Sequence, residues 1–351
     1  MIPRPSNQFD ETRAARDRVR IASLLENDDS DGSSGLADAV CGYLDSPRPF
    51  FTRLRVSYRK VPLGARTAIL RGIAHFRPST ADGFPSWPIE RRIDDALRLS
   101  GRRISYAGKA AAVVITHDID SRAELGAIDR VRSVEAPFGI VSAFGFVPNE
   151  SWPAEKLARS IVDQGCEVYW HDIAHNGRLP YLGPDGIRAA FDRVAERHPW
   201  AVELMRTFRA GQLLVSRDLL DVVAERFAID MSIPDTERDG PFGGAAGCGT
   251  VIPFRYGPLL ELPLTLAQEV YLHQVYGFSA NEALRIWIEK LAYIRSVGGV
   301  AVFNIHPVWV SSKHPDLFRV FQKFVETVAN TPDILVTTPS GLASATHVSS
   351  T

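Results

Sequence analysis

Residues 111–120 read AAVVITHDID, and this stretch decides the fold. Ala111 to Thr116 is a short apolar run rich in β-branched residues, which predicts a buried strand. Asp118 and Asp120 follow that run directly. In parallel β/α folds, functional side chains gather where strands end, because the loops that leave the carboxyl ends of neighbouring strands converge there. The stretch therefore predicts a strand of a parallel sheet that leads into a candidate site.

From Ala110 onward, short apolar runs alternate with amphipathic stretches, which is the pattern of β/α units. Further strands are expected over residues 138–147, 166–170, 259–264, 300–304 and 334–337. Helices are expected over residues 151–164, 186–197, 216–227, 279–297 and 315–329. Ser151 is expected to cap the first of these helices, and Ser279 with Glu282 forms a capping-box pair. About seven such β/α steps fit one barrel-like domain better than two separate domains.

The chain before the first strand has a different character. Residues 27–35, NDDSDGSSG, have the composition of a flexible linker, so residues 1–35 are expected to form a flexible N-terminal segment. Residues 36–105 contain several prolines and are expected to form an extension of short helices and loops packed on the barrel. Residues 106–345 are expected to form the barrel itself, and residues 346–351 a disordered tail.

Composition narrows the class of protein. Of 351 residues, 45% are apolar and 23% are charged, as in a soluble globular enzyme. The net charge of -1 argues against a protein built to bind nucleic acid. The three cysteines are too scattered for a disulfide framework or a thiolate zinc site. The charged first residues lack the apolar stretch of a secretory signal, and no run is long enough to span a membrane, so a cytoplasmic location is expected.

A second candidate motif is a pair of histidines. His171 and His175 follow the strand expected over residues 166–170. Histidines four residues apart face the same side if the loop enters a helical turn, and imidazole is a good ligand for Zn, Fe, Co or Ni. A surface pair is the alternative interpretation for these histidines, just as local turn chemistry is for the Asp-x-Asp sequence.

A third motif is Asn304-Ile305-His306-Pro307, at the end of the strand VAVFN. A lone histidine there is often structural, but the three motifs together are harder to explain in that way. One carboxylate and two imidazoles around a cation leave positions open for water and substrate. A neighbouring carboxylate can take a proton and a separate histidine can deliver one, which are the parts needed to hydrolyse an amide.

These motifs, in this order, resemble those of the polysaccharide deacetylases (carbohydrate esterase family four and its relatives) over roughly residues 110–339. The sequence ITHDID is similar to the branch in which one residue separates the two aspartates, and the resemblance implies that Asp118 is the catalytic base and Asp120 a metal ligand. The sequence GCEVYWHDIAH resembles the family's Gly-x-Glu-x-x-x-His-(Ser/Thr)-x-x-His, which implies that His171 and His175 are metal ligands. Asp172 stands at the Ser/Thr position that braces the loop.

The remaining family motifs are shorter. TFRAG resembles the loop whose arginine braces the base, and implies this role for Arg209 rather than Arg206. Residues 230–234, DMSIP, are the candidate for the fourth motif, and Ile305-His306-Pro307 implies that His306 is the general acid. His117 departs from the family pattern, which has an aromatic or apolar residue there. The fold implied is a distorted (β/α)7 barrel with a mixed N-terminal extension.

The expected function is that of a metal-dependent hydrolase that removes an N-acyl group, by family default N-acetyl, from a sugar or glycan. Hydrolysis of another non-peptide C–N bond, in a small amide, cyclic imide, ureide or formamide, is the alternative. A carbohydrate-binding module without activity is the alternative from another class. Zn is the expected ion, with Co, Ni, Fe and Mn as alternatives, and a homo-oligomer is left open. The candidate substrate-lining residues are His117, Trp170, Glu261 and Trp309, the tryptophans because indole rings can stack on sugars.

Overall fold

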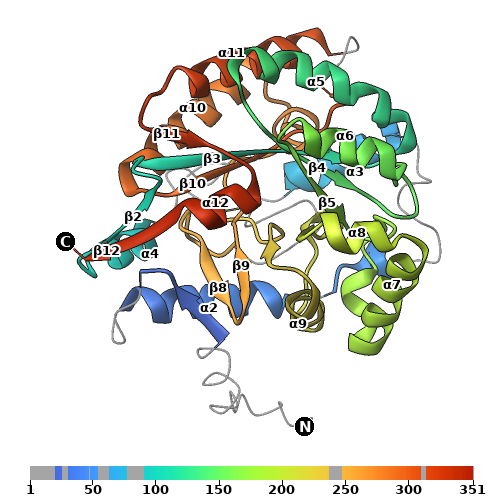
Figure 1. Ribbon diagram of the computed structural model, residues 1–351, viewed down its shortest axis with the longest axis horizontal. Coiled ribbons are helices and arrows are strands. Elements are labelled where there is room, and N and C mark those ends of the chain that lie inside the picture. The colour runs from blue at the N-terminus through green and yellow to red at the C-terminus, as the bar shows by residue number, and fades with distance from the viewer. Residues whose placement is uncertain are drawn as a thin grey trace.

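A curled β-sheet surrounded by helices forms the centre of the molecule in this computed structural model (Figure 1). The structure describes residues 20–25, 31–46, 48–53, 63–76, 91–236, 247–309 and 314–350. Neighbouring strands run parallel along the path β9-β7-β6-β5-β4-β3-β10. In chain order these strands are β3 Ala111–Ile119, β4 Ala143–Phe146, β5 Glu167–His171, β6 Thr207–Arg209, β7 Ile229–Asp230, β9 Leu259–Glu261 and β10 Val300–Asn304.

After β9 the chain makes two single bridges. Leu264 bridges to Pro234, which follows β7, and Leu266 bridges to Phe303 on β10, so the chain after β9 crosses from one end of the parallel path to the other. β11 (Ile334–Val336) pairs with the start of β3. Beyond β9, β8 (Phe254–Tyr256) and then β1 (Ile21–Ser23) pair antiparallel. The sheet is thus the distorted, incompletely closed (β/α) barrel that the alternating pattern predicts.

Helices cover the outside of the sheet (Figure 1). Those of the barrel are α5 Ile128–Glu135, α6 Glu155–Asp163, α7 Gly183–Arg197, α8 Pro199–Leu204, α9 Arg217–Arg226, α10 Ala280–Val297, α11 Pro315–Ala329 and α12 Pro339–Ala345. Ser279 and Glu282 form the predicted capping box of α10, and Gly298 ends that helix in the left-handed conformation with φ 74°. β3 is buried along its whole length, and the core continues through Trp287 of α10, whose ring lies 4.8 Å from that of Phe303.

Two described stretches of the N-terminal segment that was expected to be flexible form regular structure. β1 joins the main sheet, and α2 (Asp31–Leu44) begins inside the stretch expected to be a linker, because Leu36 and Val40 pack into the core. Residues 1–19 and 26–30 lie outside the described part of the chain. The helices described in the region that follows are η1 Phe50–Arg53, α3 Leu63–Phe76 and α4 Arg91–Arg98. Residues 54–62 and 77–90 of that extension also lie outside the description.

Three other local expectations were wrong. The expected tail forms β12 (Thr346–Ser350), which pairs antiparallel with β2 (Arg102–Tyr106). The strand expected over residues 138–147 begins only at Ala143, because residues 136–138 form a 3-10 turn that ends at Gly139 with φ 66°. Ser151 does not cap α6; its hydroxyl donates to the Ile119 carbonyl and accepts from Val147 N, so a tertiary contact replaces the local one.

Of the helices that the structure describes, none is both long enough and apolar enough to cross a membrane.

Candidate metal centre

The three predicted metal ligands lie together at the carboxyl ends of β3 and β5. Asp120 follows the last residue of β3, His171 ends β5, and His175 lies in the loop beyond it. One ligand atom from each side chain lies within 4.8 Å of the others. Asp120 Oδ1 is 3.3 Å from His171 Nε2 and 3.4 Å from His175 Nε2. The strands therefore bring together the carboxylate and the two imidazoles that the sequence singles out.

The surroundings of His171 suit a metal ligand. Its Nδ1 lies 3.2 Å from the carbonyl oxygen of Arg209, which can only accept a hydrogen bond. Nδ1 therefore carries a proton whether the ring is charged or neutral, and the neutral ring would direct the lone pair of Nε2 toward Asp120 and His175. A carboxylate with two neutral imidazoles is a donor set for a divalent cation such as Zn²⁺. The residues present thus fit the ion that the sequence motifs predict.

The loop between the two histidines is not the helical turn that their spacing suggests. Asp172 and His175 have φ values of 58° and 44°, in the left-handed region that few residues other than glycine adopt. Asp172 Oδ1 accepts a hydrogen bond from Ile173 N at 2.7 Å, so it braces the loop as expected for the Ser/Thr position. Gly211 allows this packing, because a Cβ there would lie 2.9 Å from the His175 ring. A strained, braced loop therefore places His175 beside His171.

Asp118 lies next to the three ligands and is held as an anion. Arg209 Nη1 donates to Asp118 Oδ1 at 3.1 Å, and both side chains are buried. Burial alone would raise the pKa of Asp118, but the charges of His171, Arg209 and His306 outweigh burial and lower the pKa to about 2. Arg209 is fully buried, whereas Arg206, the other candidate for this role, is exposed.

His306 lies at the end of β10 and is paired with a carboxylate that the sequence motifs did not point to. Its Nδ1 is 2.7 Å from Glu269 Oε1, and its backbone N–H donates to the same oxygen at 3.0 Å. Burial alone would lower the pKa of His306, but Glu269, with smaller contributions from Asp120 and Asp118, raises it to about 10. Glu269 follows Leu266, which bridges to β10, so its position depends on a crossing of the chain that no local pattern announces.

Glu124 is a second carboxylate that the motif analysis missed. It accepts from Ser121 Oγ at 2.9 Å and from Asp120 N at 3.3 Å. Burial and the neighbouring charge of Asp120 raise its pKa to about 7. Ser121 and Glu124 have the Ser-x-x-Glu spacing of a capping box, which is the local signal that could have found this pair.

Three of the four candidate substrate residues have buried side chains with partners other than a substrate. His117 is buried, with Nε2 2.8 Å from Glu135 Oε1 and Nδ1 3.1 Å from the carbonyl of Ile305. It is adjacent to Asp118 on a strand, so its side chain points to the opposite face of the sheet. Trp170 is 2% exposed and packs in the core against Trp152 and two phenylalanines, Phe191 and Phe227. These positions correct the expectation that both side chains reach a substrate.

Glu261, the third of these residues, is completely buried at the end of β9. Burial and the charge of Asp230 raise its pKa well above the ordinary value for a glutamate. Asp230, the first residue of the candidate fourth motif, is therefore the partner of Glu261. The glutamate that partners His306 is Glu269 instead.

Trp309, the fourth candidate, is half-buried close to His306. Its backbone N–H donates to the His306 carbonyl, and it remains a candidate to contact substrate.

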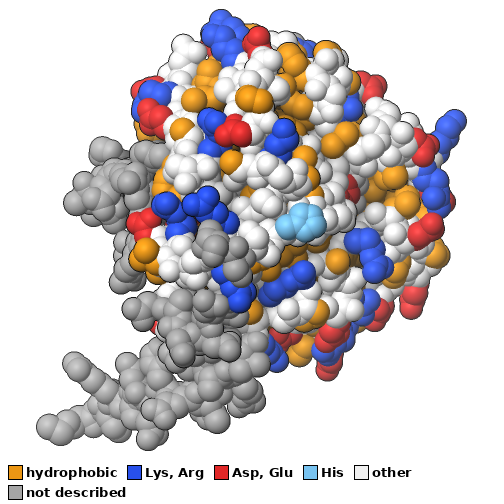
Figure 2. All heavy atoms as spheres, turned by 60° about the vertical axis from the view of Figure 1, so that its left-hand side comes forward, with side chains coloured by type: hydrophobic (Ala, Val, Ile, Leu, Met, Phe, Trp, Pro, Cys, Tyr) orange, Lys and Arg blue, Asp and Glu red, His pale blue; other side chains and the backbone are white. Residues whose placement is uncertain are grey.

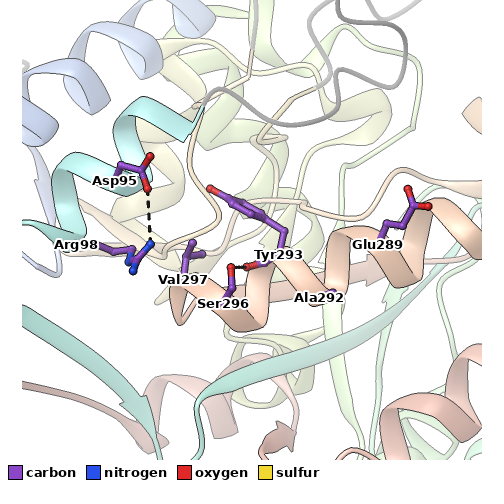
Figure 3. A pocket seen from close by; sticks show the side chains of 7 residues that line it. All are labelled: Asp95, Arg98, Glu289, Ala292, Tyr293, Ser296 and Val297. Carbon is purple, nitrogen blue, oxygen red and sulfur yellow. Dashed lines mark hydrogen bonds and ion pairs between the residues drawn. The ribbon is translucent and has the colours of Figure 1, made fainter.

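Two surface hollows lie between α4 and α10, away from the predicted site residues. Figure 3 shows the first, where Asp95 and Arg98 of α4 face Tyr293 and Ser296 of α10. The second, of about 890 Å³, continues toward β2 and is lined by basic side chains, namely Arg98, Arg102, Arg103, Lys109 and Arg295. Figure 2 shows Lys and Arg side chains on this side of the molecule. No predicted site residue lines either hollow.

Comparison with solved structures finds a similar fold in polysaccharide deacetylases and in an allantoinase. A protein assigned as a polysaccharide deacetylase from Mycobacterium smegmatis superposes with a TM-score of 0.55 at 19% identity, covering 68% of this chain and 90% of that one. The Puue allantoinase gives 0.54 at 13% identity, with 68% and 90% covered. A protein assigned to the deacetylases from Pseudomonas aeruginosa PAO1 gives 0.51 at 11%, with 68% and 91% covered. No model of a known protein family and no curated protein matches the sequence. The predicted fold is confirmed.

Proposed function

We propose that this chain is a metal-dependent hydrolase that removes an N-acyl group, N-acetyl in the first instance, from a sugar or glycan. The observation that carries the proposal is the arrangement of a base and an acid beside one candidate metal site. Asp118 is kept ionised and His306 is kept protonated, and the charge of His306 acts on both Asp118 and Asp120. A module that only bound carbohydrate would have no use for this division of protonation states.

Each side chain has a distinct part in the proposed reaction. Asp120, His171 and His175 would hold the cation, which supplies Lewis acidity toward an acyl oxygen and toward water. Asp118 accepts the proton that water loses on attack, with Arg209 orienting the carboxylate. His306 gives its proton to the departing nitrogen, and Glu269 orients the ring through Nδ1. Since Nδ1 faces Glu269, the proton that His306 transfers is the one on Nε2.

The alternative substrate class is a small molecule with another non-peptide C–N bond, such as a ureide, cyclic imide, amide or formamide. The similarity to the allantoinase fold supports this alternative, since the TM-score of the allantoinase is nearly that of the first deacetylase. A cytoplasmic location, as the sequence predicts, would fit a soluble intermediate of either class better than a polymer outside the cell.

The proposal is tested by metal analysis followed by a panel of substrates. Protein loaded with Zn²⁺ is incubated with N-acetylglucosamine, chito-oligosaccharides, a formamide and allantoin, and release of acetate, formate or the opened ureide is measured. Asp118→Asn is expected to lower kcat by about 10²- to 10⁴-fold. Hydrolysis of none of these probes by metal-loaded protein would favour a binding module instead.

Arg209 and Arg206 provide a matched pair for the same assay. Arg209→Gln removes the buried cation beside Asp118, and we expect kcat to fall by about 10- to 100-fold, as is usual when a group that orients a functional side chain is removed. Arg206→Gln removes an exposed arginine three positions earlier and should leave kcat unchanged. Equal effects of the two substitutions would remove Arg209 from the assignment.

A further inference from the structure

Both carboxylate oxygens of Asp118 accept hydrogen bonds from inside the barrel. Oδ1 accepts from the Tyr169 hydroxyl as well as from Arg209. Oδ2 accepts from Asn304 Nδ2 at 2.7 Å. Asn304 is held in turn by Thr116, whose hydroxyl lies 3.1 Å from Asn304 Oδ1. Neither Tyr169 nor Asn304 is among the charges that keep Asp118 ionised, so these two further donors call for an explanation of their own.

Tyr169 reaches Asp118 because the neighbouring strand leaves room for its ring. Gly145 on β4 pairs with Tyr169 on β5, and a Cβ on Gly145 would overlap the phenol ring. The side chain is completely buried, and a buried hydroxyl without a partner costs about 1–3 kcal/mol. Its hydroxyl has Asp118 and Arg209 as partners. Phenylalanine would fill the same space without that requirement, so the hydroxyl is explained by what it does for Asp118.

Asn304 poses the same question on β10. It is fully buried at the end of an otherwise apolar strand, VAVFN, and its amide donates to Asp118 Oδ2. Oδ2 is the oxygen that faces the candidate metal centre, 3.6 Å from His171 Nε2. Asp120 Oδ1 lies 3.3 Å from that same nitrogen. The two carboxylates are thus almost equally near to a metal-ligating imidazole, although only one of them can serve as ligand if the other is to serve as base.

We propose that Tyr169 and Asn304 are positioning residues that hold Asp118 back from the metal, so that its carboxylate stays available as the base. This inference rests on the proposed function. A carboxylate released from both donors can turn toward the cation and become a fourth protein ligand. It would then occupy a coordination position that an open catalytic site keeps for water or substrate. Asp118 would be lost as a base and the metal would lose an open position.

The test is the visible absorption spectrum of the protein loaded with one equivalent of Co²⁺, which reports the type and arrangement of the metal ligands without any substrate. We compare the wild type with Asn304→Leu, Tyr169→Phe and the double variant. Tyr106→Phe is the matched control, because Tyr106 is also completely buried but donates to the Gly298 carbonyl at the end of α10. Circular dichroism melts establish that each variant is folded, and either single variant is sufficient for the test.

We expect the d–d bands to change in position and intensity, as they do when a carboxylate replaces water on Co²⁺, more in Asn304→Leu than in Tyr169→Phe and most in the double variant. Tyr106→Phe should match the wild type. Adding Asp118→Asn to the double variant should restore the wild-type spectrum, because an amide is a poor ligand. On any probe that the wild type hydrolyses, kcat should fall by about 10- to 100-fold with little change in KM.

Two results would overturn the inference, and they differ from failure of the proposed function. If the folded variants bind one Co²⁺ with the wild-type spectrum, Tyr169 and Asn304 do not hold Asp118 back. If the spectrum changes but Asp118→Asn does not restore it, another group moves. A wild-type protein that binds no Co²⁺ would instead remove the proposed function and this inference with it.

Discussion

Two histidine–glutamate pairs of the described residues, His117 with Glu135 and His306 with Glu269, differ in whether the histidine can transfer a proton. His117 and Glu135 meet at 2.8 Å, and His306 and Glu269 meet at 2.7 Å. Both side chains of the first pair are completely buried, and both ring nitrogens of His117 face acceptors, Glu135 and the Ile305 carbonyl. The His306 ring keeps 12% of its surface exposed, and Glu269 engages only its Nδ1.

The difference shows that pairing with a glutamate does not by itself make a histidine catalytic. A histidine can deliver a proton to a substrate only if one nitrogen remains available beside the reacting atoms. His117 has no available ring nitrogen and does not face the candidate metal centre, although it is adjacent in sequence to Asp118. His306 meets both conditions if Asp120, His171 and His175 hold a cation. The comparison therefore predicts a loss of catalysis from one pair and a loss of stability from the other.

The largest expected effect comes from the catalytic pair. His306→Gln removes the proposed acid, and kcat should fall by about 10²- to 10⁴-fold, the usual contribution of a positioned acid or base. The bound metal should remain, because His306 is not among the three ligands. Kinetics and metal content, measured on the same sample, check both statements. A variant that keeps full activity would show that His306 is as structural as His117.

Removing the carboxylate of this pair should have a smaller effect with a distinctive pH dependence. Glu269 raises the pKa of His306, which would otherwise be lowered by burial, so Glu269→Gln lowers that pKa. The acid form is then lost at lower pH, and the alkaline limb of the kcat profile should move down by at least about one unit, with kcat falling about 10- to 100-fold. The limb in the metal-loaded wild type should itself lie below 10, because a nearby cation disfavours the imidazolium. An unmoved limb would separate Glu269 from the reaction.

The structural pair should respond in stability alone. His117→Leu removes the imidazole partner of Glu135, whose carboxylate keeps its hydrogen bonds from Arg132 and Ser142, so the free energy of unfolding should fall by about 1–3 kcal/mol, the cost of an unsatisfied buried polar group. Adding Glu135→Leu should lower it further, because Arg132 then loses its carboxylate partner. Denaturant unfolding measures these differences. A large fall in kcat in a folded His117→Leu protein would contradict the assignment of this pair to the core.

The sequence predicts those features that depend on local pattern. The alternation of strands and helices predicts the distorted barrel, and the capping box of Ser279 and Glu282 places the start of α10. The order of the Asp, His-x-x-x-His and Ile-His-Pro motifs predicts which side chains converge, because parallel strands all end at one edge of the sheet. Ligand positions at strand ends are therefore accessible from the sequence alone.

The features that were missed depend on the register between strands and on chain crossings. Tyr169 meets Asp118 only because Gly145 stands beside it on β4, and Glu269 reaches His306 only through the segment that crosses to β10. Neither pairing has a local signal. Likewise, Trp170 looks like a sugar-stacking residue in sequence, but it is on the core side of β5. Side-chain direction at such positions is set by packing rather than by neighbouring residues.

The most direct test of this account is a crystal structure of the protein grown with Zn²⁺, with anomalous diffraction data collected at the zinc absorption edge. The account predicts one strong anomalous peak bonded to Asp120, His171 Nε2 and His175, with Asp118 hydrogen-bonded beside the ion but not coordinating it. A peak at another place, or none in zinc-saturated crystals, would contradict the central claim that these side chains form one metal centre.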